Sequence, residues 1–156
     1  MAYTLLIFIS ISLAMISLGT YIRGQQVLTS AEELKQKIEL NQLNTVIYVK
    51  DIYLSGNLLY VTISNNGSTT LYAFKYFDVI VKYYANISNV PTLLLSRYNY
   101  SNTLGPYTWI SQSIVINPNT VGTFIINLPY PPYPNTQATI VIASNYGPKA
   151  VWSGAI

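Results

Sequence analysis

The chain has 156 residues, of which 51% are hydrophobic and only 8% charged, against about 25% charged residues in typical soluble domains. It has no Cys and no His, which excludes a disulfide framework and any catalytic or metal site built on those side chains. Its net charge of +3 is spread along the sequence and is too small to predict nucleic-acid binding.

Residues 1–22 form an uncharged apolar segment. As an α-helix the segment would be about 33 Å long, enough to cross a hydrocarbon core of about 30 Å. Its hydroxyl side chains can bond back into the helix or across to a neighbouring helix. The alternative is a secretory signal peptide with Ser17–Gly19 as its cleavage site. Against that alternative, no basic residue precedes the apolar run, and the run is longer than a usual signal-peptide core.

We expect this helix to assemble with other helices through a small set of its side chains. The candidate assembly residues are Leu5, Ile9, Leu13, Ile16, Ala14 and Gly19. Ala14 and Gly19 are the positions where we expect close helix approach, because small side chains let two backbones come together.

A second helical pattern follows Arg23 and Gly24. Apolar residues recur there at spacings of four, three and four, which predicts a single stripe: Val27, Ala31, Leu34 and Ile38. Ser30 and Glu33 have the spacing of a capping box. Two alternatives follow: one helix from about residue 2 to 43, or a break near Gly24 and a restart at Ser30. In either case we expect the stripe to pack on the remaining domain or on partner helices.

From Thr45 onward the sequence pattern has a period of two, which predicts β-strands. The predicted strands are residues 45–54, 58–64, 76–84, 92–100, 113–117, 122–128, 138–144 and 149–156. Short strands with regular turn signals and no intervening helix are typical of an antiparallel, immunoglobulin-like sandwich. The predicted fold class is therefore α+β, mostly β. A hydrophobic and amphipathic assembly helix over residues 1–43 would precede a β-sandwich domain over residues 45–156.

Asn66-Gly67 lies between two alternating runs, which predicts a two-residue hairpin turn. The same pair begins an N-glycosylation sequon, and further sequons begin at Asn86 and Asn99. All of them fall at predicted turns or strand ends, where an acceptor must be exposed. We therefore expect Asn66, Asn86 and Asn99 to be glycosylation candidates if this part of the chain lies outside the membrane.

The strand-rich part of the sequence contains a proline-rich segment and many tyrosines. Residues 129–134, PYPPYP, cannot lie in a central strand, because proline donates no ladder hydrogen bond. We interpret them as a stiff connection between strands; the alternative is a ligand for an aromatic groove. The 15 tyrosines are expected to fill half-buried sheet surface and to supply subunit contacts.

The sequence predicts no active site. It has no His for general base catalysis and no glycine-rich phosphate loop. Asp51 and Asp78 are the only carboxylates after residue 45, and they suit nothing stronger than a loose calcium site. We therefore expect a protein that is not an enzyme, with no catalytic, cofactor-binding or metal-ligating residues and no cofactor.

Three stretches carry a resemblance to archaeal type IV pilin-like proteins, which include adhesive pilins, archaellins and the sandwich-bearing stator subunits of the archaellum. Residues 59–84, LYVTISNNGSTTLYAFKYFDVIVKYY, look like the strand–NxGxT–strand unit of that superfamily. Residues 116–129 and 138–147 are similar to its closing strands. Pilin precursors carry a short basic leader, which is not seen before this helix. We therefore expect either numbering that starts near the mature chain or a leaderless, stator-type subunit.

The resemblance implies a structural subunit of an archaeal type IV pilus-like extracellular filament. The helices would rest in the membrane and then bundle into the core of a helical homo-oligomer, with the sandwiches as an outer sheath. The alternative that it implies is a membrane-anchored archaellum stator or accessory subunit whose outer sandwich binds the surface layer. An enzyme is the third hypothesis, and the residue inventory opposes it.

Overall fold

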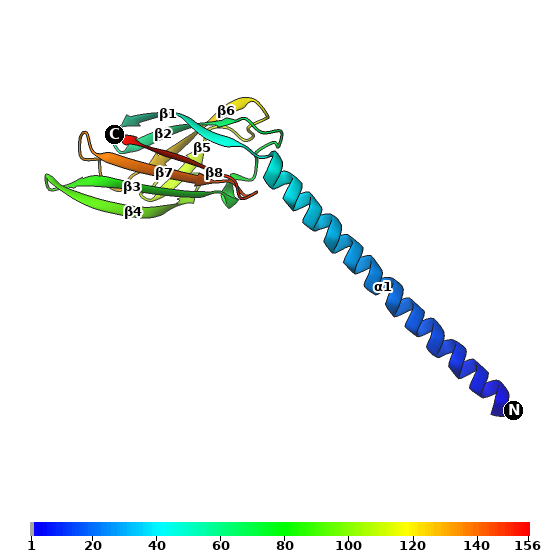
Figure 1. Ribbon diagram of the computed structural model, residues 1–156. Helices are drawn as coiled ribbons and strands as arrows, with labels where there is room; N and C mark the ends of the chain where they lie inside the picture. The colour runs from blue at the N-terminus through cyan, green and yellow to red at the C-terminus, as the bar shows by residue number, and fades with distance from the viewer. Residues whose placement is uncertain (1) are drawn as a thin grey trace. The chain divides into compact units, whose positions relative to one another are not determined.

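The structure is a computed structural model that describes residues 2–156, so Met1, the first residue of the predicted helix, lies outside the described part. One long helix precedes eight strands, as Figure 1 labels them. The chain divides into two compact units, one ending at Leu40 and the other running from Asn41 to Ile156.

Helix α1 runs without a break from Ala2 to Asn44. Gly24 lies in its interior, where glycine costs about 1 kcal/mol relative to alanine without forcing a break. The Ser30 hydroxyl donates to the Gln26 carbonyl at 2.9 Å, so Ser30 is an interior residue and not a helix cap. The single-helix alternative is therefore confirmed, and the predicted capping box is wrong, because a cap needs a non-helical residue at the helix start.

Eight strands form the second unit. Their bounds are β1 Ile47–Ser55, β2 Leu58–Asn65, β3 Asp78–Ile87, β4 Val90–Tyr100, β5 Thr108–Ser111, β6 Thr120–Asn127, β7 Gln137–Ala143 and β8 Lys149–Ala155, with a short 3₁₀ helix, η1, at Phe74–Tyr76. The strand order is β1-β2-β6-β5-β4-β3-β7-β8, and every neighbouring pair is antiparallel except β4–β5. The outermost strands β1 and β8 lie beside each other. The predicted immunoglobulin-like, mostly β sandwich is confirmed.

Alternation along the strands builds the core. In β2 and β3, every second side chain is buried. Trp109, Phe124, Phe74 and Phe77 form an aromatic cluster at the centre, with ring centroids 4.7–6.1 Å apart along the chain of contacts. Burying such rings stabilises a domain both by the area removed from water and by edge-to-face contacts.

One predicted strand is wrong and one real strand was missed. Residues 113–117 do not form a strand, although their sequence alternates. Only Ile116 of that stretch is buried, through an isolated bridge to Leu71, while Ile114 is 91% exposed. The missed strand is β5, whose four residues are too few to show a period of two.

The PYPPYP segment is a connection that packs along β3. The Asn86 N–H donates to the Pro131 carbonyl at 2.8 Å, and the Tyr133 N–H donates to the Tyr84 carbonyl at 2.8 Å. Pro132 forms an isolated bridge with Ala85. The prolines leave no backbone donor unsatisfied where they lie, so the interpretation of this segment as a connection between strands is confirmed.

Candidate assembly surfaces

Four predicted assembly residues share one face of α1. Leu5, Ile9, Leu13 and Ile16 line the same shallow hollow along the helix. Each of these side chains is at least 50% exposed in the single chain. Burying apolar surface is the main drive for association, so a face of this kind favours contact with lipid or with other helices.

Ala14 and Gly19 do not form one surface. At 3.6 residues per turn, Ala14 lies about 180° from Leu5, whereas Gly19 lies near the face that carries Leu5 and Ile16. A side chain added at Gly19 would meet nothing within 4 Å. Gly19 therefore lies beside the Leu5 face with open space around it, and Ala14 belongs to the opposite face.

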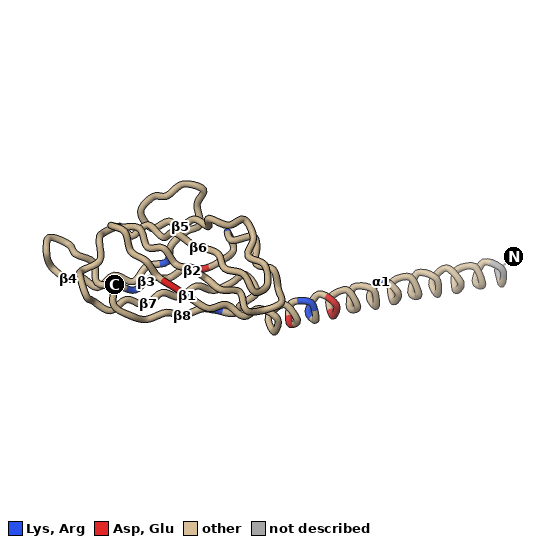
Figure 2. The backbone as a smooth tube through the Cα atoms, turned by 90° about the horizontal axis from the view of Figure 1, so that it is seen from above, with Lys and Arg blue, Asp and Glu red and all other residues tan. Residues whose placement is uncertain are grey.

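Three hydroxyl side chains in the apolar part of α1 hydrogen bond to the helix's own backbone. The hydroxyls of Ser10, Ser12 and Thr20 donate to carbonyls one turn earlier, at 2.8–3.1 Å. No charged residue precedes Arg23 in the sequence, and Figure 2 shows the coloured charged positions of α1 in the second half of the helix. By length and composition, α1 can cross a membrane.

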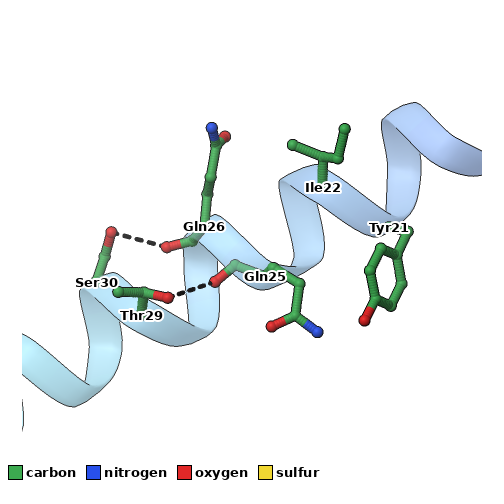
Figure 3. A pocket seen from close by; sticks show the side chains of 6 residues that line it. All are labelled: Tyr21, Ile22, Gln25, Gln26, Thr29 and Ser30. Carbon is green, nitrogen blue, oxygen red and sulfur yellow. Dashed lines mark hydrogen bonds between the residues drawn. The ribbon is translucent and has the colours of Figure 1, made fainter.

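The second half of α1 carries the amphipathic stripe. Val27, Leu34 and Ile38 are 50–69% exposed in the single chain. A hollow nearby is lined by Tyr21, Ile22, Gln25, Gln26, Thr29 and Ser30 (Figure 3). The hydroxyls of Thr29 and Ser30 donate to the helix's own carbonyls, so they are not turned to a ligand. The hollow is a surface feature of one helix and does not predict a binding site.

The loop that begins at Asn66-Gly67 hydrogen bonds to Asn44, the last residue of α1, and to Val46. The N–H groups of Asn66 and Gly67 donate to the Val46 carbonyl at 2.8 and 3.2 Å. Those of Ser68 and Thr69 donate to the Asn44 carbonyl at 2.8 and 3.3 Å. The last carbonyls of a helix have no partner within it, so the loop supplies part of what the terminus lacks.

The predicted Asn66-Gly67 hairpin is therefore wrong. Strand β2 pairs with β1 and β6 and not with the strand that follows the loop. The φ angle of Gly67 is not positive, as a type I′ turn would require. Glycine is needed at position 67 because two backbone segments cross closely there. A Cβ at Gly67 would lie 2.2 Å from the Asn44 carbonyl oxygen. The hairpin that does have two positive φ angles is Ser88-Asn89, between β3 and β4.

The sequon residues differ in accessibility. Asn66 is exposed in the loop after β2, and its Oδ1 accepts a hydrogen bond from the Ser64 hydroxyl at 2.6 Å. Asn99 is exposed near the end of β4. Asn86 is only half exposed near the end of β3, where its backbone is tied to the PYPPYP segment. Two of the three candidates are thus freely presented.

The tyrosines divide between the core and the surface. Burial raises the pKa of Tyr83 to about 12, although its hydroxyl donates to the Tyr130 carbonyl at 3.0 Å. Burial raises the pKa of Tyr98 as well. Exposed tyrosines available for contacts are Tyr48, Tyr53, Tyr72, Tyr76, Tyr84, Tyr100, Tyr107 and Tyr130. Some tyrosines of the sandwich therefore fill its core, and others are exposed where they could contact a partner.

The two Asp side chains of the sandwich have different bonding partners. Asp51 Oδ1 accepts a hydrogen bond from the Ile52 N–H at 2.9 Å, and Asp78 forms an ion pair with Arg97. Within residues 2–156, no three acidic, His or Cys side chains gather into a metal-binding group.

Residues 43–154 match a protein family described as conserved flagellar protein F, immunoglobulin-like domain. No curated protein matches the chain. Among solved structures, the archaellum periplasmic stator protein FlaG from Sulfolobus acidocaldarius is 23% identical, with a TM-score of 0.57 over 70% of this chain and 98% of that one. The complex of the stator proteins FlaF and FlaG from the same organism gives 20% identity and a TM-score of 0.57, over 69% and 86% of the two chains.

A filament structure is also similar. The archaeal flagellum of Methanospirillum hungatei strain JF1 is 16% identical, with a TM-score of 0.64 over 99% of this chain and 96% of that one. At these identities the solved structures establish a shared fold. The family match spans the sandwich from its first strand into its last. The chain therefore belongs to the family of the conserved flagellar protein F, immunoglobulin-like domain, and is an archaellum-associated protein.

Proposed function

We propose that this protein is a membrane-anchored archaellum subunit of the stator type, whose sandwich binds a protein partner outside the membrane. The observation that carries the proposal is the family match over residues 43–154. The uncharged first half of α1 supports it, because such a segment is stable in lipid without a partner helix. The sequence alone favoured a filament subunit; the family match moves the stator role ahead of it.

A filament subunit is the second candidate. It is supported by the similarity to the Methanospirillum hungatei flagellum, which extends over the long helix as well as the sandwich. In that role the Leu5 face of α1 would pack in a helical homo-oligomer after leaving the membrane, and the sandwich would lie outside. Neither role needs chemistry, and we propose that the protein is not an enzyme.

The two roles are separated by where the native protein is found. Cells would be sheared to release filaments, and both the filaments and the membranes would be probed for this chain. The stator role predicts that the chain stays with the membranes and is extracted only by detergent. Recovery of the chain as the main component of sheared fibres would overturn the stator role and support the filament role. Mass spectrometry of its N-terminus in each fraction would add whether it is processed.

A matched pair of substitutions tests the anchor. Leu13 and Leu34 are 62% and 60% exposed on α1, but only Leu13 lies in the uncharged segment. An Asp at the centre of a membrane helix costs about 2.5–3.5 kcal/mol. We expect Leu13→Asp to release the protein from membranes and Leu34→Asp to leave it there. Equal retention of both variants would contradict a membrane anchor formed by the first half of α1.

We also propose Asn66 and Asn99 as the glycosylated sequons. Their exposure gives an enzyme access that the half-exposed Asn86 lacks. Peptide mass spectrometry of the native protein would find a glycan mass on Asn66 or Asn99 that Asn→Gln substitution removes. Finding all three asparagines unmodified, or only Asn86 modified, would refute this assignment.

A further inference from the structure

Asn66-Gly67 is the only Asn-Gly pair in the sequence. Asn-Gly pairs deamidate more readily than other asparagine pairs, because glycine has no side chain to hinder the approach of its backbone nitrogen to the asparagine side chain. In this reaction the Gly67 nitrogen loses its proton and bonds to the Asn66 Cγ, the Cγ–Nδ2 bond breaks, and ammonia leaves. Water then opens the cyclic imide and gives an aspartate or an isoaspartate at position 66.

The nucleophile of this reaction is held by two hydrogen bonds. The Gly67 N–H donates to the Val46 carbonyl at 3.2 Å and to the Asn65 Oδ1 at 3.1 Å. An N–H that is bonded to two neutral acceptors gives up its proton less readily, and the acceptors fix the position of its nitrogen. Both hydrogen bonds must therefore break before the Gly67 nitrogen is free to attack.

The side chain of Asn65 is itself fixed in the sandwich. It is fully buried, and its Nδ2 donates to the Thr69 carbonyl at 2.8 Å and to the Ile116 carbonyl at 3.2 Å. The Asn65 amide therefore connects Gly67 at its oxygen with two backbone carbonyls at its nitrogen. Because a buried amide that loses its partners costs free energy, this arrangement is stable while the loop stays in place.

The electrophile is not protected in the same way. Asn66 is exposed, and its Oδ1 accepts a hydrogen bond from the Ser64 hydroxyl at 2.6 Å. A donor on this oxygen stabilises the negative charge that develops there when a nitrogen attacks the Cγ. Water also reaches the exposed side chain, as hydrolysis of the imide requires. The structure therefore combines an activated Asn66 side chain with a Gly67 nitrogen that is held back.

We propose that Asn66 is a deamidation site that the fold controls. The reaction is blocked while Val46 and Asn65 hold the Gly67 N–H, and it proceeds once the loop leaves them. The isoaspartate product inserts an extra carbon into the backbone ahead of Gly67, where the close crossing leaves no room even for a Cβ. The hydrogen bonds from this loop to Asn44 and Val46 then cannot all form again, so the opening of the loop becomes permanent.

This inference does not depend on the proposed stator role. It applies to copies of the chain without a glycan on Asn66, because an N-linked glycan is attached through the Nδ2 atom that must leave as ammonia. Glycosylation and deamidation of Asn66 therefore exclude each other, and the experiments need protein made in a host that does not glycosylate asparagine.

Deamidation rates in the folded and the unfolded protein test the control by the fold. The full-length protein in detergent would be kept at mildly alkaline pH with and without guanidinium chloride. Trypsin then releases residues 51–75, whose fragment masses distinguish Asn57, Asn65 and Asn66. We expect Asn66 to react about tenfold or more slowly in the folded protein, because two hydrogen bonds must break first. Equal rates in the two states would overturn the proposal.

Amide hydrogen exchange provides a quantitative form of this test. Exchange of the Gly67 N–H requires the same release from Val46 and Asn65 that deamidation requires. We therefore expect folding to slow Gly67 exchange and Asn66 deamidation by similar factors, with exchange measured by NMR of the full-length protein in detergent. Deamidation that is slowed far less than exchange would show that the bonded Gly67 N–H does not control the reaction.

A matched pair of substitutions tests the part of Asn65. Asn65→Ala removes one acceptor of the Gly67 N–H, whereas Thr69→Val keeps the Thr69 carbonyl and both of these hydrogen bonds. Relative to the unfolded rate of each variant, we expect Asn65→Ala to accelerate deamidation of the folded protein about threefold or more and Thr69→Val to leave it unchanged. Equal rates would contradict this role of Asn65. Circular dichroism checks folding, and if Asn65→Ala does not fold, the exchange measurement on the wild type decides.

Discussion

At the residue scale, Gly67 shows how one sequence signal can serve a different structure. Asn-Gly is typical of tight hairpins because both residues accept positive φ angles. Gly67 instead lets the loop after β2 cross the chain just beyond α1, where a Cβ would lie 2.6 Å from the Val46 nitrogen. The residue type is selected by lack of space and not by backbone conformation.

Gly67→Ala should therefore destabilise the sandwich. The added methyl group would push backbone against backbone, and overpacking of this kind costs about 1–3 kcal/mol. Gly105→Ala is the matched control, because its nearest neighbour would be the Thr108 hydroxyl at 4.0 Å. Urea unfolding followed by circular dichroism measures both free energies. A loss no larger for Gly67→Ala than for Gly105→Ala would mean that the crossing tolerates a side chain.

Tyr83 makes the stability of the sandwich sensitive to high pH. Burial raises its pKa from 10.0 to about 12 in the folded protein, so between these values the unfolded chain loses the phenol proton while the folded chain keeps it. Deprotonation then favours unfolding, and stability is lost as the pH rises from about 10 to 12.

We expect Tyr83→Phe to reduce this alkaline loss of stability. The variant also loses the hydrogen bond to the Tyr130 carbonyl, which lowers stability at every pH. The informative quantity is therefore the change in unfolding free energy between pH 9 and pH 12 within each protein. That change should be smaller in Tyr83→Phe than in wild type. Tyr53→Phe, at a 63% exposed position, should behave as wild type; an equal effect of both variants would rule out Tyr83 as the cause.

At the element scale, β5 joins the two halves of the sandwich although it has only four residues. It pairs with β6 on one side and, through two residues, with β4 on the other. Its Trp109 is fully buried, with ring centroids 4.7 Å from Phe124 and 5.1 Å from Tyr100. The strand is therefore held by one large side chain more than by its own short ladder.

Replacing Trp109 should show how much that side chain contributes. Trp109→Ala would leave a large cavity at the sheet junction and lower the free energy of unfolding by about 3–5 kcal/mol. Trp109→Phe should cost less, because the indole N–H is buried without a hydrogen-bond partner in this structure and nothing polar is lost with it. Urea denaturation measures both. Equal losses for the two variants would show that ring packing is not what holds β5.

At the scale of the whole molecule, the sandwich has its own core. Every residue of the buried cluster lies between Ile47 and Ala150, inside the second compact unit. We therefore expect residues 41–156 to fold alone, with a melting temperature within about 3 °C of that of the full-length protein in detergent. Thermal circular dichroism at the β-sheet wavelength is the measurement. Failure of residues 41–156 to melt cooperatively would mean that α1 is required for folding.

Much of this fold could be predicted because its signals are local. The uncharged run of residues 1–22 indicates a helix by itself, and β2 and β3 alternate so regularly that their bounds differ from prediction by only a few residues. Of the candidate surfaces, the Leu5 face follows from helical spacing alone. The predictions that failed needed distant information: residues 113–117 alternate, but no strand lies where they could pair beyond Leu71.

The sequence by itself determined a long apolar helix, a cysteine-free β-sandwich and the absence of a His- or Cys-based site, because these depend on composition and on periods of two or 3.6 residues. Only the tertiary structure decided that Gly67 lets the loop after β2 cross the chain just beyond α1, that β5 joins the sheets, and that β4 keeps an open edge. The physical reason is that hydrogen-bond pairing between strands joins residues far apart in the chain. No local pattern records which backbone groups are left without a partner.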